Sequence, residues 1–291
     1  MKELNLFCFG FGQVAKNFLT KIKSSNISLK LVTTTREKSK QDNFENIIYE
    51  KLQFNENYFD QLIIEKLKKA DHVLISIPPI NNEDIVIKNF KSLIANSKTK
   101  WITYLSATSV YGDHKGEWVN EQSTTNPTNI NGMNRLKAEN SWMKLAKEND
   151  LPLQIFRLSG IYSNESNILL RIKSGEVKLI NKKNQFFSRI HVEDIANILC
   201  NSLNNFKKNE IFNISDDKPA SAEEVAMYGV KLLGANKPKT IEINEVKSEM
   251  LKGFYKDSKK VNNKKMKEFF NYKLKYPSYV EGLNYIFNNT I

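Results

Sequence analysis

Short apolar runs alternate with amphipathic helical patterns through the first half of the chain, and this alternation limits the folds it can adopt. Each apolar run is short enough for a buried strand, and most segments between two runs have helical periodicity. Such βαβ alternation predicts an α/β fold, a Rossmann-type doubly wound parallel sheet with helices on both faces. The expected strands lie within residues 4–10, 27–35, 46–54, 71–79, 100–110 and 151–159, and the expected helices at 13–24, 58–70, 85–97 and 132–149.

The second half of the chain is less regular. Strands are expected at 186–192 and 210–215, and helices at 193–203 and 221–234, the latter ending at Gly234. We therefore expect a Rossmann-type domain over residues 1–160. A smaller substrate-binding lobe is expected over 161–291, with some segments returning to the main sheet.

The chain is strongly basic, because 44 Lys and Arg residues against 32 Asp and Glu leave a net charge of +12. Arginine occurs only at 36, 135, 157, 171 and 189. The lysines are spread along the chain without interleaved aromatic residues, so a solvated surface is favoured over nucleic-acid binding. This charge also suits cofactor phosphates or an anionic small-molecule substrate.

The cysteine content and the apolar runs bear on the compartment. Cys8 and Cys200 lie far apart and form no CxxC pair, which argues against a disulfide framework and a metal site. Both are expected to be packing residues in a reducing cytoplasm. No uncharged apolar run approaches the length of a membrane span, and the N-terminus does not resemble a signal peptide. The oligomeric state stays open, a homodimer being one compatible arrangement.

The stretch GFGQVA, residues 10–15, fits the G-x-G-x-x-G/A motif of dinucleotide-binding loops. It follows the first expected strand and opens the first expected helix. Gly10 would permit the tight turn, Gly12 would let the backbone approach a diphosphate, and Ala15 would let helix and strand pack closely. Phe11, Gln13 and Val14 complete this expected cofactor loop, and the alternative is a glycine turn that serves packing only.

The end of the second strand distinguishes the two nicotinamide dinucleotides. NAD-binding proteins place an acidic residue there to hold the ribose hydroxyls. Here Thr34, Thr35 and Arg36 occupy this place, and Glu37 comes only after them. A guanidinium pairs with a phosphate through two hydrogen bonds, so NADP is favoured over NAD. The alternative is that Arg36 is a solvent-exposed residue without a ligand.

The fourth strand ends in the sequence SIPPI, where Ile77, Pro78 and Pro79 lie next to the expected nicotinamide-ribose region. The two prolines remove backbone donors and stiffen the chain. They would either shape a wall of the cofactor site or simply end the strand.

Several motifs together resemble the extended short-chain dehydrogenase/reductase family, of the nucleotide-sugar epimerase and dehydratase type. They are GFGQVA, LSATSVYGD at 105–113, RLSGIY at 157–162, FSRIHVEDIA at 187–196 and EIFNISDD at 210–217. The likeness is greatest to an atypical branch that shares SIPP, TSVYGD and a C-terminal FYKDSKKVNN at 254–263. The resemblance implies an NAD(P)-dependent oxidoreductase or epimerase.

The catalytic triad that the resemblance implies is replaced. The serine or threonine position is Ala107, the tyrosine position is Asn131 and the lysine position is Arg135. Acid–base help of order 10² to 10⁴ in rate would be absent at the first two positions. Arg135 would then bind the nicotinamide ribose or a substrate anion, or else pair with Glu139 on the helix surface.

Other side chains could replace the missing groups. Thr108, Tyr111 and Arg135 are the candidate catalytic residues, although a packing role for Tyr111 is the simpler interpretation. Ser106 is expected beside the cofactor, and the expected substrate-binding residues are Ser109, His114, Asn131 and Arg189. Arg157 is expected in an internal salt bridge, and Asp194 in the first turn of a helix. An alternative to an enzyme is a non-catalytic NADP(H) sensor that regulates a protein partner.

Overall fold

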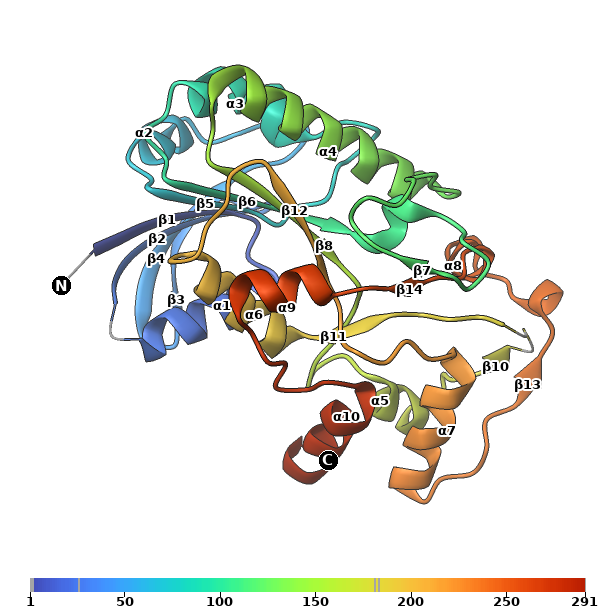
Figure 1. Ribbon diagram of the computed structural model, residues 1–291. Helices are drawn as coiled ribbons and strands as arrows, with labels where there is room; N and C mark the ends of the chain where they lie inside the picture. The colour runs from blue at the N-terminus through green and yellow to red at the C-terminus, as the bar shows by residue number, and fades with distance from the viewer. Residues whose placement is uncertain (1–2, 26, 181, 183, 291) are drawn as a thin grey trace. The chain divides into compact units, whose positions relative to one another are not determined.

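A central sheet organises the first half of the chain in the computed structural model, which describes residues 3–25, 27–180, 182 and 184–290. Eight strands lie in the order β12-β8-β6-β5-β1-β2-β4-β3 (Figure 1). The pairs β1–β2, β1–β5, β2–β4 and β5–β6 are parallel, which confirms the predicted fold class. The strands are β1 (Glu3–Phe9), β2 (Ser28–Thr35), β3 (Lys40–Phe44), β4 (Ile47–Gln53), β5 (His72–Ile75), β6 (Trp101–Ala107), β8 (Leu153–Leu158) and β12 (Glu210–Ile214).

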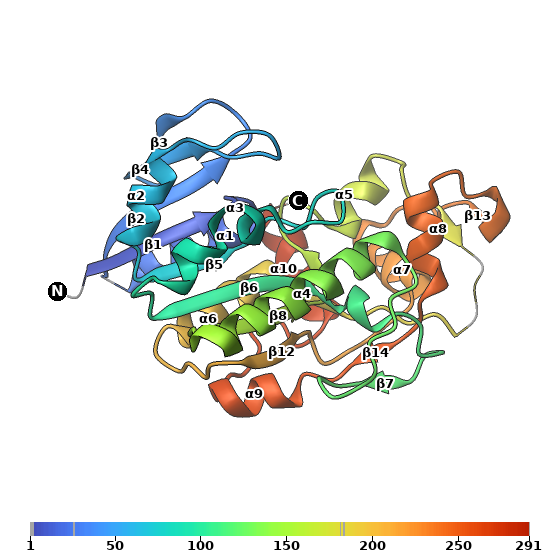
Figure 2. The same ribbon diagram turned by 90° about the horizontal axis from the view of Figure 1, so that it is seen from above.

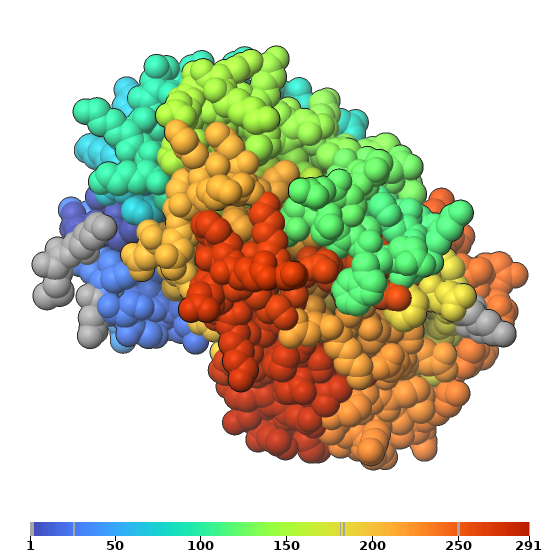
Figure 3. All heavy atoms as spheres, viewed as in Figure 1, coloured from blue at the N-terminus to red at the C-terminus, as the bar shows by residue number. Residues whose placement is uncertain are grey.

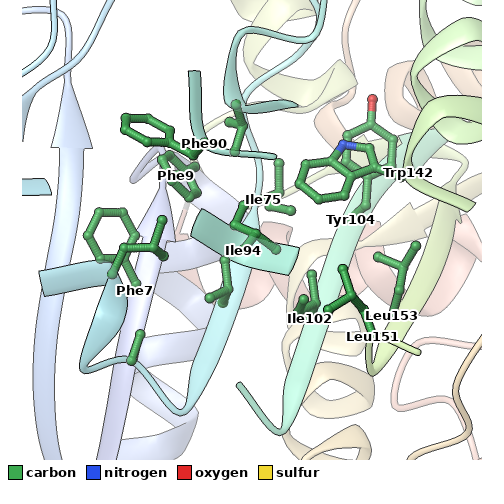
Figure 4. Packing of buried hydrophobic residues seen from close by; sticks show 14 of the residues in the cluster. Phe7, Phe9, Ile75, Phe90, Ile94, Ile102, Tyr104, Trp142, Leu151 and Leu153 are labelled. Atoms are coloured by element: carbon green, nitrogen blue, oxygen red, sulfur yellow. The ribbon is translucent and has the colours of Figure 1, made fainter. Parts of the chain in front are cut away.

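Helices cover both faces of this sheet. Figure 1 shows α2 (Leu62–Lys68), α3 (Ile85–Ala95) and α4 (Ile130–Asn149) on one face, and α1 (Gln13–Ser24) and α6 (Val192–Ser202) on the other. The strands read as continuous apolar runs because a parallel sheet is buried on both sides. Phe9, Phe90, Ile102 and Trp142 belong to one cluster of buried side chains between the sheet and α2–α4 (Figure 4).

The β3–β4 hairpin was not predicted as such, because only β4 has an apolar pattern. β3 is polar, pairs antiparallel with β4 and lies at the edge of the sheet (Figure 2). Its turn places Glu45 and Asn46 at positive φ. A polar edge strand exposes fewer apolar side chains for unwanted pairing, so its pattern resembles that of a loop.

The chain divides into two compact units. The first contains residues 1–106, 134–157 and 195–212, and the second contains 107–133, 158–194 and 213–291. This division differs from a single boundary at residue 160, because segment 107–133 belongs to the second unit and segment 195–212 to the first. β12 supplies the sheet with a strand from the C-terminal half of the chain.

The second unit is built from short strand pairs and helices. Its strands pair as β9 (Gly160–Tyr162) with β11 (Arg189–His191), β7 (Trp118–Val119) with β14 (Lys260–Val261), and β10 (Leu179–Ile180) with β13 (Thr240–Ile241). Tyr162, Leu169, Val225 and Leu283 belong to one of its apolar clusters. Its helices are α5 (Ile168–Lys173), α7 (Ala222–Leu233), α8 (Glu249–Lys256), α9 (Lys264–Phe270) and α10 (Tyr279–Thr290), with 3₁₀ turns η1 (Thr108–Tyr111) and η2 (Ile243–Glu245).

A buried ion pair joins α4 to β8 in the first unit. The Arg157 guanidinium donates from Nε and Nη2 to the carboxylate of Glu139, at 2.7 Å for the shortest contact. Both side chains are at most 5% exposed. The internal salt bridge expected for Arg157 is therefore present. The opposite face of α4 is exposed and carries Lys137, Lys144 and Lys147, and Figure 3 shows this side of the molecule.

Removing one partner of this pair should strongly destabilise the first unit. Glu139→Gln leaves the Arg157 charge buried without its counter-charge, so we expect the free energy of unfolding to fall by about 3–5 kcal/mol. Urea denaturation followed by circular dichroism measures this. The control is Glu148→Gln, which breaks an exposed pair with Lys144 and should change stability by about 0.5 kcal/mol or less. Equal effects of the two substitutions would contradict the prediction.

Candidate functional site

The turn between β1 and α1 has the backbone geometry of a phosphate-binding loop. Gly10 has φ +88°, and a Cβ there would lie 2.7 Å from Ile77 Cγ2 and 2.8 Å from Ser76 Oγ. Glycine is therefore required both by conformation and by the close approach of the end of β5. The Gly10 N–H donates to Thr34 Oγ1 at 2.9 Å, which ties the turn to β2.

Gly12 plays a different part from Gly10. It is the N-cap of α1, no side-chain hydrogen bond caps the helix there, and a Cβ would meet no atom within 4 Å. The helix therefore presents its first-turn N–H groups, including those of Gln13 and Val14, beside open space. Amides and the helix dipole in this arrangement bind anions, so the loop fits a dinucleotide diphosphate.

Aromatic contacts hold the residue between the two glycines. The Phe11 ring lies 5.7 Å from the Phe44 ring and 5.1 Å from the Tyr49 ring, centroid to centroid. Both partners come from the β3–β4 hairpin. The hairpin, which sequence reasoning missed, therefore packs directly against the phosphate loop.

The three residues at the end of β2 have separate environments. Thr34 is buried and its hydroxyl accepts the Gly10 N–H, so its role is structural. The Thr35 hydroxyl accepts the Glu37 N–H at 3.2 Å. Arg36 is exposed, and within the described part of the chain its guanidinium has no ion-pair or hydrogen-bond partner. Arg36 is thus available to an external anion.

The SIPPI segment is hydrogen-bonded to the end of β1. The Ser76 and Ile77 N–H groups both donate to the Phe9 carbonyl oxygen, at 2.9 and 3.1 Å. Ile77 packs against the main core and against Gly10, whereas Pro78 is exposed and Pro79 is partly buried. β5 ends at Ile75, so the prolines follow the strand and Ile77 shapes the back of the phosphate loop.

Arg135 binds the end of β6. Its Nη1 donates to the Leu105 carbonyl oxygen at 2.7 Å. The pairing of Arg135 with Glu139 considered from the sequence is not formed, because Glu139 pairs with Arg157. The neighbouring Ser106 is 2% exposed, and its hydroxyl has no hydrogen-bond partner among the described residues.

The second unit contains the TSVYG motif, residues 108–112. Tyr111 is fully buried, and its hydroxyl donates to Asn213 Oδ1 at 2.7 Å. Gly112 has φ +71°, and a Cβ there would lie 1.8 Å from the Asn126 carbonyl oxygen. These contacts favour the packing role for Tyr111 over that of a relocated acid.

Three expected ligand-binding residues lie near this motif. Thr108 and Ser109 are partly buried in η1, and Asn131 is exposed in the first turn of α4. Gly132 lets this turn approach η1 closely, since a Cβ there would lie 2.6 Å from the Ser109 carbonyl oxygen. Asn131 therefore immediately precedes Gly132, the residue at which α4 contacts η1.

His114 and Arg189 mainly contact backbone carbonyls. His114 Nε2 lies 3.2 Å from the carbonyl oxygens of both Tyr111 and Thr124. Arg189 Nη1 donates to the carbonyl oxygens of Phe187 and Ala220, at 2.9 and 3.0 Å. These contacts hold loops together and leave a substrate-binding role as a prediction.

The C-terminal FYKDSKKVNN segment has more contacts than sequence reasoning assigned to it. Lys259 Nζ donates to the Gly112 carbonyl oxygen at 2.9 Å and lies 3.5 Å from Asp257 Oδ2. The Ser258 carbonyl oxygen accepts the N–H groups of His114 and Gly116. The segment thus holds the TSVYG loop in place through hydrogen bonds. In the sequence, only the FYKDSKKVNN motif itself indicated that this segment matters.

Part of the chain matches a known family model. Residues 88–215 match the model described as the NAD dependent epimerase/dehydratase family. No curated protein sequence matches the chain.

Solved structures of similar fold cover the chain almost completely. A functionally unknown conserved protein from Silicibacter pomeroyi is 29% identical, with a TM-score of 0.86, over 100% of this chain and 99% of its own. dTDP-glucose 4,6-dehydratase from Bacillus anthracis, solved with NAD, is 17% identical, with a TM-score of 0.75, over 99% and 96%. UDP-glucuronic acid 4-epimerase from Bacillus cereus, also solved with NAD, is 17% identical, with a TM-score of 0.75, over 98% of each chain. At these identities the likeness to the two enzymes shows a shared fold.

Neither a metal-binding cluster nor a membrane-spanning helix is found among the residues that the structure describes. No group of three or more His, Cys, Asp or Glu side chains there is arranged to hold a metal ion. None of the helices described is both long and apolar enough to cross a bilayer.

The epimerase-family motif FSRIHVEDIA contributes a buried histidine. His191 lies between the rings of Tyr162 and Tyr276, at 5.0 and 4.1 Å. Its Nδ1 accepts the Glu193 N–H at 3.2 Å, and its buried Nε2 has no partner within the described residues. Burial lowers the pKa of His191 from 6.5 to about 4, so the ring is neutral in the folded protein.

Asp194, next along α6, has a structural role. Its carboxylate accepts hydrogen bonds from the Tyr272 hydroxyl and from the N–H groups of Lys275 and Tyr276, at 2.7–3.0 Å. These bonds join α6 to the segment before α10. The position in the first turn of a helix agrees with the sequence expectation.

His191 should make the folded state sensitive to acid. Its folded pKa lies below its unfolded value, so its neutral form supports stability above pH 6.5, and this is lost as the pH falls toward 4. We expect His191→Asn, which keeps an acceptor for the Glu193 N–H, to be less stable at pH 7.5. Relative to that variant, the wild type should lose about 3 kcal/mol between pH 7.5 and 4.

Urea denaturation of both proteins at each pH measures this difference. Asp194 and Asp216 also titrate, because burial raises the pKa of both carboxyl groups. They are present in both proteins, so the comparison isolates the histidine. Parallel pH profiles for the two proteins would show the prediction to be wrong.

Proposed function

We propose that this chain binds NADP(H) and acts as an oxidoreductase or epimerase on a nucleotide sugar or a similar anionic small molecule. The observation that carries the proposal is the open space at Gly12, which the first amides of α1 border. Arg36, the residue that follows β2, is exposed and available to an anion. The family match at residues 88–215 supports an NAD(P)-dependent reaction.

Each part of the cofactor would have its own residues. The amides of the 10–15 loop would bind the diphosphate, and Ile77 would lie behind it. When bound, the nicotinamide would supply hydride transfer to or from the substrate.

The choice of NADP over NAD rests on Arg36. The two enzymes compared above were solved with NAD, so their structures do not support the phosphorylated form. Here no acidic residue lies at the end of β2, and the Arg36 guanidinium is exposed. Two charge-assisted hydrogen bonds to a 2′-phosphate would favour NADPH. Free Cys8 and Cys200 accord with a cytoplasmic protein in this proposal.

A non-catalytic NADP(H) sensor is the second candidate. It is favoured by the replacement of the triad and by the burial of Tyr111, whose hydroxyl is bonded to Asn213. A sensor needs the phosphate loop and Arg36 but no proton donor. A screen of nucleotide sugars and other anionic carbonyl or hydroxyl compounds for NADP(H) turnover separates the two. Binding without turnover of any compound would favour the sensor.

Arg36→Ala should reduce NADPH affinity at least about tenfold and leave NADH affinity nearly unchanged, since only NADPH has the 2′-phosphate. The fluorescence of the reduced cofactor in titrations measures both dissociation constants. Arg171→Ala, which removes another exposed arginine, is the matched control and should change neither. If the wild type binds NADH as tightly as NADPH, the NADP preference is wrong.

Gly12→Ala should weaken the binding of both cofactors by about tenfold or more without changing the melting temperature. The added methyl group meets no protein atom within 4 Å, but it enters the space where a diphosphate would approach the amides. Gly253→Ala is the control, since its nearest contact would be 3.9 Å away. Unchanged cofactor affinity in Gly12→Ala would count against the phosphate loop itself.

A further inference from the structure

Three hydrogen-bond donors gather at the carboxyl end of β6 in the first unit. They are the Tyr104 hydroxyl, the Ser106 hydroxyl and the Arg135 guanidinium. Residues 104 and 106 are two apart in a strand, so both side chains project from the same face of the sheet. That face is the one covered by α4, because Tyr104 packs with Trp142.

Tyr104 is a core residue with an unsatisfied polar end. Its ring centroid lies 6.2 Å from that of Trp142, and the residue is fully buried. Figure 4 shows its hydroxyl directed away from Ile102, toward the carboxyl end of the strand. No hydrogen bond to this oxygen is formed within the described residues. A buried hydroxyl without a partner costs about 1–3 kcal/mol, so its retention calls for an explanation.

Arg135 lies next to this hydroxyl. Its bond to the Leu105 carbonyl oxygen places the guanidinium beside the peptide that links Tyr104 to Ser106. Burial raises the pKa of Tyr104, and the nearby Arg135 charge opposes that rise. Arg135 is only partly buried, whereas Tyr104 and Ser106 are buried.

The acids near these donors are already engaged. Asp84 Oδ1 accepts the N–H groups of Val86 and Ile87, and its Oδ2 accepts Trp142 Nε1 at 2.8 Å. Glu139 binds Arg157. Donors are therefore in excess at this end of β6, and the group that completes them must be an acceptor.

We propose that Tyr104, Ser106 and Arg135 form an oxyanion pocket that binds a carboxylate, or another anionic oxygen, of the substrate. The inference rests on the proposed function and narrows its substrate to compounds that bear such a group. Arg135, which is partly buried, would supply the charge, and the two buried hydroxyls would donate hydrogen bonds.

Calorimetric titration with sodium acetate, with and without saturating NADP, tests this pocket; sodium chloride controls for ionic strength. The wild type should bind one acetate per chain. Tyr104→Phe and Ser106→Ala should each weaken acetate binding about tenfold or more, because a hydrogen bond to a charged group is lost. Arg135→Gln should abolish it. Tyr58→Phe, at a tyrosine that is 54% exposed, and Arg171→Gln are matched controls that should bind acetate normally.

Tyr104→Phe keeps the shape of the core, so the variant should fold, and its NADPH affinity should stay within about twofold of wild type. Unchanged acetate affinity in this variant, or no acetate binding by wild type, would overturn the pocket. NADPH binding is measured separately in the same samples. Its loss in wild type would instead remove the proposed function.

Discussion

The approach of the backbone at Gly10 to the end of β5 is the constraint on which the candidate cofactor site depends. A single added carbon would collide with Ile77 and Ser76, and the turn needs positive φ. Because this contact joins β1 to the chain after β5, it fixes where β1 ends and α1 begins. Gly12 then lies beside open space, and the helix amides are left for a ligand. The two glycines of the motif thus serve different purposes, one for packing and one for access.

Helix α4 carries a structural residue, Glu139, and a candidate site residue, Arg135, within a few turns. Glu139 is fully committed to Arg157, while Arg135, one turn earlier, holds the Leu105 carbonyl oxygen at the end of β6. The chain has 44 basic residues, of which five are arginines and 39 are lysines. Positions 135 and 157 are two of the five that carry arginine. A planar guanidinium can make several hydrogen bonds in fixed directions, and a lysine ammonium cannot reproduce that geometry. This accounts for arginine at both places.

Sequence reasoning succeeded where local pattern and burial agree. α1 lies at the residues expected from the helical periodicity, and β2, β8 and β12 lie within their expected apolar runs. It failed at the β3–β4 hairpin, because a polar edge strand has no apolar pattern, although Phe44 and Tyr49 pack on the phosphate loop. It could not choose between the roles of Tyr111, since its partner Asn213 lies 102 positions away in the chain. The contacts of Lys259 and Ser258 were hidden for the same reason.

By itself, the sequence determined the α/β class, and it predicted the position of a phosphate loop and the replacement of the usual triad at 107, 131 and 135. These follow from residue identity and short-range periodicity. Only the tertiary structure decided that Glu139 pairs with Arg157, that Thr34 serves the loop, and that Tyr104 directs an unpaired hydroxyl toward the end of β6. Hydrogen bonds and burial depend on which distant segments meet, and periodicity records only which face of an element is apolar.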